Sequence, residues 1–125
     1  MKDLPKLKAV FFRATSGREP VREWLLSLDK AERRQVGTDI AYVQFKWPIG
    51  KPRVDHLRGV IWEIRTRLEN RISRVLFAVE GGEMVLLHGF IKKTQKTAND
   101  DIELAENRWK DWKSGQGKQA PRIKL

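Results

Sequence analysis

Residues 60–91 contain three short apolar segments separated by two turns, and no other stretch limits the fold of this chain so strongly. Residues 60–68 (VIWEIRTRL) alternate between apolar and polar side chains, and residues 72–79 (ISRVLFAV) follow a tight polar break. Two glycines then lead into residues 83–91 (EMVLLHGFI), whose nearly continuous apolar character is typical of a strand inside a sheet. The stretch therefore predicts an antiparallel meander that opens with a hairpin.

One strand and two helices are expected before the meander. Residues 7–13 (LKAVFFR) favour a first strand, because Val and Phe are common in strands and a Thr-Ser-Gly turn follows. Residues 20–28 predict a helix that begins at a proline, since a missing N–H is tolerated in the first turn. Residues 29–32 (DKAE) form a capping-box pattern for a second helix, which ends before Trp47. The two helices are expected to form an N-terminal helical hairpin.

A last helix is expected over residues 99–112, where apolar side chains recur at helical spacing: Ile102, Ala105, Trp109 and Trp112. Together, these elements predict an α+β fold with a small, mostly antiparallel sheet, an N-terminal helical hairpin and a C-terminal helix, with the helices on one face. A chain of 125 residues is expected to form one domain, which we place at residues 1–112. Residues 113–125 are expected to be a basic, flexible tail.

The composition excludes several kinds of chemistry. The chain has no cysteine and two histidines, so a cysteine nucleophile and thiolate metal sites are impossible, and neither a metal nor another cofactor is predicted. The 26 Lys and Arg against 16 Asp and Glu give a net charge of +10, which favours a polyanionic partner such as RNA or the ribosome. A basic domain without a polyanionic ligand is the alternative. The apolar run before Arg13 is too short for a signal peptide or a membrane span, so a cytoplasmic protein without a membrane partner is expected.

Two arginines of the meander are the first candidate site residues. Alternation places Arg65 and Arg67 on one strand face together with Glu63. A register that pairs the apolar faces brings Arg74 beside Arg65. Like charges opposite each other are destabilising, so the two arginines predict a bound anion on an exposed sheet face. In the alternative interpretation, Glu63 and Glu69 neutralise both arginines.

Further basic residues and two histidines complete the candidate site. Lys92, Lys93 and Lys96 occur where the chain leaves the sheet, and crowding among cations can lower the pKa of a lysine enough for acid catalysis. The alternative is a solvated basic loop. The candidates for contact with RNA are His56, Arg58, Arg67 and His88, and a structural role is the alternative for His88. Trp47 is the one tryptophan that we consider for base stacking.

Four segments of the chain resemble one known family: PVREWLLSL, HLRGVIWEIRTR, RISRVLF and HGFIKKTQKTANDDIELAENRWKDW. Over residues 7–112 the chain resembles the phage-derived HigB-like branch of the RelE/ParE toxin superfamily. The resemblance implies a RelE/ParE-like fold and a toxin of a type II toxin–antitoxin system. It further implies a metal-independent endoribonuclease that cleaves mRNA on the ribosome, inhibits translation and is silenced by a cognate helix-turn-helix antitoxin.

The resemblance also implies roles for particular residues. Family members stabilise the scissile phosphate with basic residues of the central sheet, and the matching catalytic positions here are Arg65, Arg74, Lys92, Lys93 and Lys96. This sequence departs from the family at Glu63, where some relatives have a cation, and at Ala98, where a proline is usual. A tyrosine that some members use near the final helix has no match, because the only tyrosine is Tyr42.

Two alternative functions stay open. ParE-like members of the superfamily poison DNA gyrase with the same fold and cleave no RNA. A non-catalytic module would use its basic sheet only to neutralise the phosphates of RNA.

Overall fold

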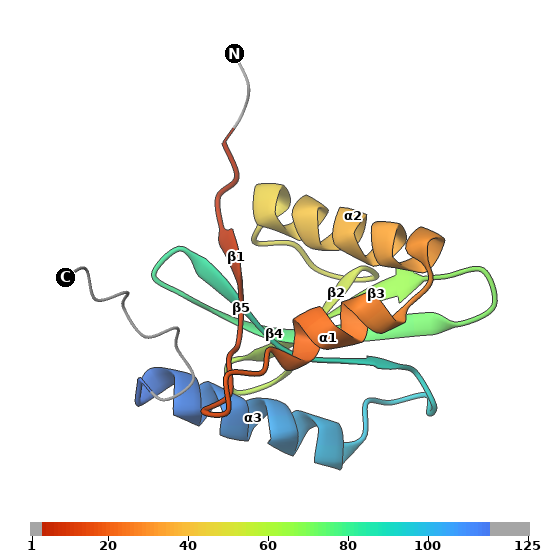
Figure 1. Cartoon of the computed structure of the whole chain (residues 1–125). Coiled ribbons are helices and arrows are strands. Elements are labelled where there is room, and N and C mark those ends of the chain that lie inside the picture. The colour runs from red at the N-terminus through yellow and green to blue at the C-terminus, as the bar shows by residue number, and fades with distance from the viewer. Residues whose placement is uncertain (1–3, 116–125) are drawn as a thin grey trace.

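The computed structural model describes residues 4–115, which form a five-stranded sheet with three helices (Figure 1). In chain order the elements are β1 (Lys8–Phe11), α1 (Pro20–Ser27), α2 (Lys30–Lys46), β2 (Val54–Arg58), β3 (Ile61–Arg67), β4 (Ile72–Glu80), β5 (Glu83–Ile91) and α3 (Asn99–Lys113). The strand order across the sheet is β1-β5-β4-β3-β2. Strands β3, β4 and β5 form the predicted antiparallel meander. Most of the expected tail, from residue 116 onward, lies outside the described residues.

The first strand changes the predicted fold class. Strand β1 pairs with β5 in parallel, with Lys8 opposite Glu83 and Phe11 opposite Leu86. The sheet is therefore mixed, and the chain begins with a strand that α1 and α2 follow, so the predicted mostly antiparallel sheet with an N-terminal helical hairpin is wrong. Two parallel strands have to be joined by a long connection, and here the connection contains both helices α1 and α2 and the strands β2, β3 and β4. An apolar pattern can predict a strand, but it does not indicate whether that strand pairs in parallel or antiparallel with a strand far along the chain.

The helices lie on both faces of the sheet, which corrects the prediction that they share one face. Helices α1 and α2 cover one face and α3 covers the other (Figure 1). The neighbours Leu76 and Phe77 belong to the cores on opposite faces, and both are fully buried. A sheet with apolar side chains on both faces has to be covered twice. Ala105 and Trp112 of α3 contribute to the second core.

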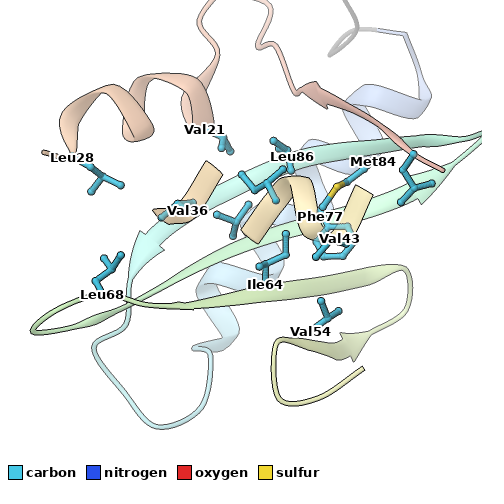
Figure 2. Packing of buried hydrophobic residues seen from close by; sticks show 13 residues of the cluster. Val21, Leu28, Val36, Val43, Val54, Ile64, Leu68, Phe77, Met84 and Leu86 are labelled. Atoms are coloured by element: carbon cyan, nitrogen blue, oxygen red, sulfur yellow. The ribbon is translucent and has the colours of Figure 1, made fainter. Parts of the chain in front are cut away.

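The larger core lies between the sheet and the helices α1 and α2 (Figure 2). Val36, Ile40 and Val43 of α2 are buried in it, as their helical spacing predicts. Burial of an aliphatic side chain of this size stabilises a fold by about 1.5–3 kcal/mol. The start of α2 also follows the predicted pattern, because the Asp29 side chain accepts a hydrogen bond of 2.8 Å from the Glu32 backbone N–H. Helix α2 is therefore held firmly against the sheet.

The packing of α1 on β5 depends on a glycine. A Cβ atom added at Gly89 would lie 2.4 Å from Cε3 of Trp24, which is far inside van der Waals contact. We expect Gly89→Ala to lower the free energy of unfolding by about 1–3 kcal/mol, because the indole ring has to move. Urea denaturation monitored by circular dichroism measures this loss.

Gly37→Ala is the matched control for Gly89→Ala. Gly37 lies within α2 and has no atom within 4 Å of an added Cβ, so alanine should stabilise the protein by about 0.5–1 kcal/mol. Equal free energies of unfolding for the two variants would contradict the close approach of Trp24 to β5.

None of the helices within residues 4–115 is long and apolar enough to cross a lipid bilayer.

Candidate functional site: a cationic groove at the sheet edge

An open groove of about 850 Å³ lies where α2, the loop before β2, the end of β3 and the start of β4 meet. Six of its lining side chains are cationic: Lys51, Arg53, Arg65, Arg67, Arg74 and Lys92. Among the described residues that line it, Asp39 is the acidic one. Such an excess of positive charge in a concave surface concentrates anions, and phosphate groups are the chemical class that fits.

The groove exists because β2 is shorter than its neighbour. Val54, the first residue of β2, pairs with Ile64, so no β2 residue pairs with the last three residues of β3. One further hydrogen bond of 2.8 Å joins the Arg65 N–H to the Arg53 carbonyl, and the chain then turns away through the loop at residues 49–53. The uncovered end of β3 leaves Arg65 and Arg67 beside open space.

Arg65 and Arg74 lie directly opposite each other on β3 and β4, as the register predicted from the sequence requires. The Arg65 side chain is 38% exposed. Its Nε donates a hydrogen bond of 2.9 Å to Oε2 of Glu63, and its Nη2 donates one of 3.2 Å to Oδ2 of Asp55. Two carboxylates therefore hold the Arg65 guanidinium at the edge of the groove while the side chain stays accessible.

The exposure predicted for Arg74 is wrong, because its side chain is only 2% exposed. Its Nη1 donates a hydrogen bond of 2.9 Å to Oγ1 of Thr97, and its Nη2 donates one of 2.7 Å to the Gln95 carbonyl. The remaining Nε lies 3.7 Å from Oε1 of Glu63 and is buried without a hydrogen bond. The segment that leads into α3 closes over Arg74, which alternation along a strand cannot reveal.

Glu63 is the residue that joins the two arginines, and its side chain is fully buried. Besides Arg65 and Arg74 it contacts Thr97, whose hydroxyl donates a 2.5 Å hydrogen bond to Oε1. The alternative interpretation from the sequence is thus confirmed for Glu63. No ion pair among the described residues links Glu69 to either arginine. The same-face alternation of Glu63 and Arg65 was the signal that could have identified this carboxylate as part of the site.

The three predicted lysines separate in the structure. Lys92 lines the groove, and its backbone N–H donates a 2.8 Å hydrogen bond to the Ile72 carbonyl, which fixes the start of the segment. Lys93 and Lys96 are exposed and are not among the lining residues. The structure brings Lys92 together with the arginines and leaves the other two lysines outside the groove.

Of the two arginines predicted to contact RNA, Arg67 lines the groove and Arg58 does not. Arg67 is exposed at the end of β3 and lines the groove. Arg58 instead binds α3, because its Nη2 donates a 2.8 Å hydrogen bond to Glu106 and its Nη1 donates one of 2.6 Å to Asn99. The Arg58 hydrogen bond holds the pKa of Glu106 below its usual range. Arg58 therefore docks α3 on the sheet, away from the groove.

Both predicted histidines lie outside the groove. His56 pairs with Trp62, on the face that α1 and α2 cover, and its Nε2 lies 2.7 Å from the Gly59 carbonyl. His88 lies on the other face, where its Nε2–H donates a 2.8 Å hydrogen bond to Asp101 of α3. The structure favours the structural role that was the alternative for His88.

Burial lowers the pKa of His88, although the hydrogen bond to Asp101 acts in the opposite direction. The pKa of His88 is therefore lower in the folded protein than in the unfolded chain, where it has the ordinary value of about 6.5. The neutral ring contributes its full stability above about pH 6.5. That stability is lost as the pH falls from this value through the lower pKa of the folded protein. We expect the free energy of unfolding to fall between pH 7.5 and pH 5.5, by at most about 1.4 kcal/mol per pH unit for one proton.

Urea denaturation at several pH values tests the contribution of His88. His88→Gln should flatten the pH dependence, whereas His56→Gln, a change at an exposed histidine, is the control that should leave it in place. An unchanged pH dependence in His88→Gln would show that burial of this ring has no titration effect.

Several residues of the groove were not among the predicted site residues. Gln35, Asp39 and Tyr42 line it from α2 at positions i, i+4 and i+7, next to the stripe that faces the core. Lys51 and Arg53 come from the loop before β2. Their spacing along α2 was visible, but only the fold brings that helix face next to the end of β3.

The described residues hold no group of three or more His, Cys, Asp or Glu side chains arranged to bind a metal ion. The carboxylate that lines the groove and the two beside it all contact arginine or lysine: Asp39 contacts Arg53, Asp55 contacts Arg65 and Lys51, and Glu63 contacts Arg65 and Arg74. These carboxylates thus hold arginine and lysine side chains in position.

Known proteins resemble this chain over most or part of its length. A family model described as "Phage derived protein Gp49-like (DUF891)" matches residues 23–110. Two similar relatives are both named "Probable endoribonuclease HigB1", one from Mycobacterium tuberculosis strain CDC 1551 / Oshkosh and one from strain ATCC 25618 / H37Rv. Each is 42% identical over 65 residues, which are 52% of this chain and 52% of the relative. The chain thus spans about half the length of the curated relatives it matches.

Proposed function

This chain belongs to the phage derived protein Gp49-like (DUF891) family, and on that premise we propose that it is the toxin of a toxin–antitoxin pair and acts as an endoribonuclease. The observation that carries the proposal is the groove in which Arg65, Arg67 and Lys92 face open space beside the buried Arg74. The name of the two similar mycobacterial proteins supports the same activity. The finer assignment to the RelE/ParE superfamily rests on the sequence motifs.

The proposed reaction is cleavage of mRNA by its own 2′-hydroxyl. This oxygen attacks the adjacent phosphorus and gives up its proton to water, the bond from phosphorus to the 5′-oxygen breaks, and the leaving 5′-oxygen gains a proton from an acid of the groove, which leaves a 2′,3′-cyclic phosphate and a 5′-hydroxyl. Arg65 remains protonated and offers a planar fork, so its role is to bind the phosphate oxygens as negative charge accumulates on them. Lys92 is the lysine of the groove and is proposed as the acid that protonates the leaving oxygen.

Arg74 is proposed as a positioning residue. Both of its Nη atoms donate to the segment that contains Gln95 and Thr97, so they hold the connection between β5 and α3 against the sheet. That connection carries Lys92. Lys93 and Lys96, which are exposed beside the groove, are proposed to attract the RNA backbone without taking part in the chemistry.

The proposal includes no metal ion, because a groove lined by six cations repels a further cation. We also propose that the ribosome presents the mRNA, since orientation of the reacting groups contributes roughly 7–11 kcal/mol to intramolecular reactions. A cytoplasmic location and a cognate helix-turn-helix antitoxin complete the proposal.

Controlled expression of the chain, with mapping of mRNA 5′ ends, tests this function. Cuts within translated messages would support an endoribonuclease, and cleavage by purified protein of mRNA mixed with ribosomes, but not of mRNA alone, would support cleavage on the ribosome. Replication arrest with intact mRNA would identify a gyrase poison instead. Intact mRNA without growth arrest would leave only an RNA-binding module.

Binding of single-stranded RNA should weaken as salt is raised, with a log–log slope of about −0.7 for each phosphate contact. Arg67 is exposed and lines the groove, so Arg67→Ala should remove one phosphate contact and make the slope shallower by about 0.7. Arg18→Ala removes the same charge from a distant exposed ion pair and is the control. Fluorescence anisotropy at several salt concentrations measures the slopes, and a flat salt response would contradict the phosphate contacts.

A further inference from the structure

One part of the groove is built for something other than a phosphate. Tyr42 of α2 lines the groove and is 40% exposed, and the guanidinium of Arg53 lies over its ring, 3.9 Å from the ring centroid. The Arg53 side chain is itself 37% exposed. A planar aromatic ring with a planar cation stacked on it therefore borders the open space of the groove.

The Arg53 guanidinium is held in place by a carboxylate. Asp39 is nearly buried one turn before Tyr42 on α2, and its Oδ1 lies 3.9 Å from Nε of Arg53. This ion pair draws Arg53 toward α2 and over the tyrosine ring. Arg53 is also tied to the sheet, because its backbone carbonyl accepts a hydrogen bond from Arg65. The stacked pair is thus fixed relative to the arginine proposed to bind phosphate.

The other candidate for stacking, Trp47, is partly buried and is not among the residues that line the groove. Its ring packs edge-on against Trp62 and Phe77, with ring centroids 5.1 and 5.6 Å apart, and contacts the core under α2. Trp47 is therefore not placed to stack on a base in the groove, although the sequence made it a candidate. Tyr42 is the aromatic residue among those described as lining the groove.

We propose that the stacked pair of Tyr42 and Arg53 is a nucleobase-binding subsite for single-stranded RNA. The inference rests on the proposed RNA substrate and deepens it. One base stacks on the exposed surface of the pair, while the phosphate of the same segment of RNA lies against Arg65, Arg67 and Lys92. Stacking does not depend on base identity, because every base has a flat π-face, so the subsite sets where the strand lies in the groove.

The test uses the full-length protein and a fluorescein-labelled decamer of 2′-O-methyl RNA, which cannot be cleaved because its 2′-oxygens are blocked. A second decamer is abasic at every position, because a strand that binds without base preference can slide past a single abasic nucleotide, and fluorescence anisotropy gives the dissociation constants. We expect the wild type to bind the abasic decamer about 5- to 100-fold more weakly than the intact one. Tyr42→Leu should abolish this difference between intact and abasic RNA, and Tyr42→Phe should retain it.

Phe45→Leu is the matched control, because Phe45 is exposed to a similar extent on the same helix but is not among the lining residues. Arg53→Lys keeps the charge and removes the guanidinium plane, so it should reduce the abasic effect even if Tyr42→Leu fails to fold. The proposal is overturned if the wild type binds the abasic and intact decamers equally well, if Tyr42→Leu keeps the effect, or if Phe45→Leu loses it to the same extent.

The outcome is separable from that of the proposed function. Cleavage of mRNA in cells without any abasic effect would refute the subsite alone. An abasic effect that depends on Tyr42, in a protein that leaves mRNA intact, would refute the endoribonuclease and keep the subsite.

Discussion

Arg65→Ala should reduce RNA cleavage by about 100-fold or more and should abolish growth arrest on expression. Removing one donor that stabilises an anionic transition state costs about 10²–10³ in rate in enzymes that depend on such donors. Arg65 is the accessible arginine between two carboxylates that fix its orientation. Single-turnover cleavage of ribosome-bound mRNA measures the loss in rate.

Arg65→Lys separates charge from geometry. Lysine keeps the positive charge but lacks the planar fork, so cleavage should still fall markedly even though RNA binding is largely kept. Arg18→Ala controls for the lost charge, because Arg18 is exposed, is paired with Glu23 and is not among the residues that line the groove. Equal activity of Arg65→Ala and Arg18→Ala would show that the groove is not the place of cleavage.

The fold should survive the change at Arg65. Glu63 keeps its contacts with Arg74 and Thr97 when Arg65 is removed, so we expect a loss of about 1–3 kcal/mol rather than unfolding. Circular dichroism of Arg65→Ala distinguishes a chemical defect from a folding defect.

Glu63→Leu should have the largest effect on stability, at about 3–5 kcal/mol. The change leaves the guanidinium of Arg74 buried without its carboxylate, and an unpaired buried charge is strongly destabilising. The Thr97 hydroxyl loses its acceptor as well. Urea denaturation measures the difference in the free energy of unfolding.

The double variant Glu63→Leu with Arg74→Met should regain most of that loss, because apolar side chains of similar size often replace a buried ion pair without cost. A double-mutant cycle then gives the coupling between the two positions. Glu69→Ala is the control, since Glu69 is exposed and should change stability by less than about 0.5 kcal/mol. Glu63→Leu as stable as Glu69→Ala would contradict the buried pair.

The candidate site could be predicted in part from the sequence. The pairing of Arg65 with Arg74 follows from alternation and from the short turn between their strands, and the structure has that register. The accessibility of Arg74 could not be predicted, because Gln95 and Thr97 reach it from a segment more than 20 residues away. The basic residues alone could not show which would face the groove, so Arg58 and His88 were grouped with Arg67 although both bind α3.

Local patterns along the chain were enough to predict the meander, the bounds of α2 to within a residue or two and the identity of its core face. These properties depend on neighbours in the chain: apolar spacing, a capping aspartate and glycine turns. Four features follow from the folded arrangement alone: the parallel direction of β1, the separate face of α3, the burial of Glu63 with Arg74 and the contact of Tyr42 with Arg53. These features depend on contacts between residues far apart in the chain, which local periodicity does not encode.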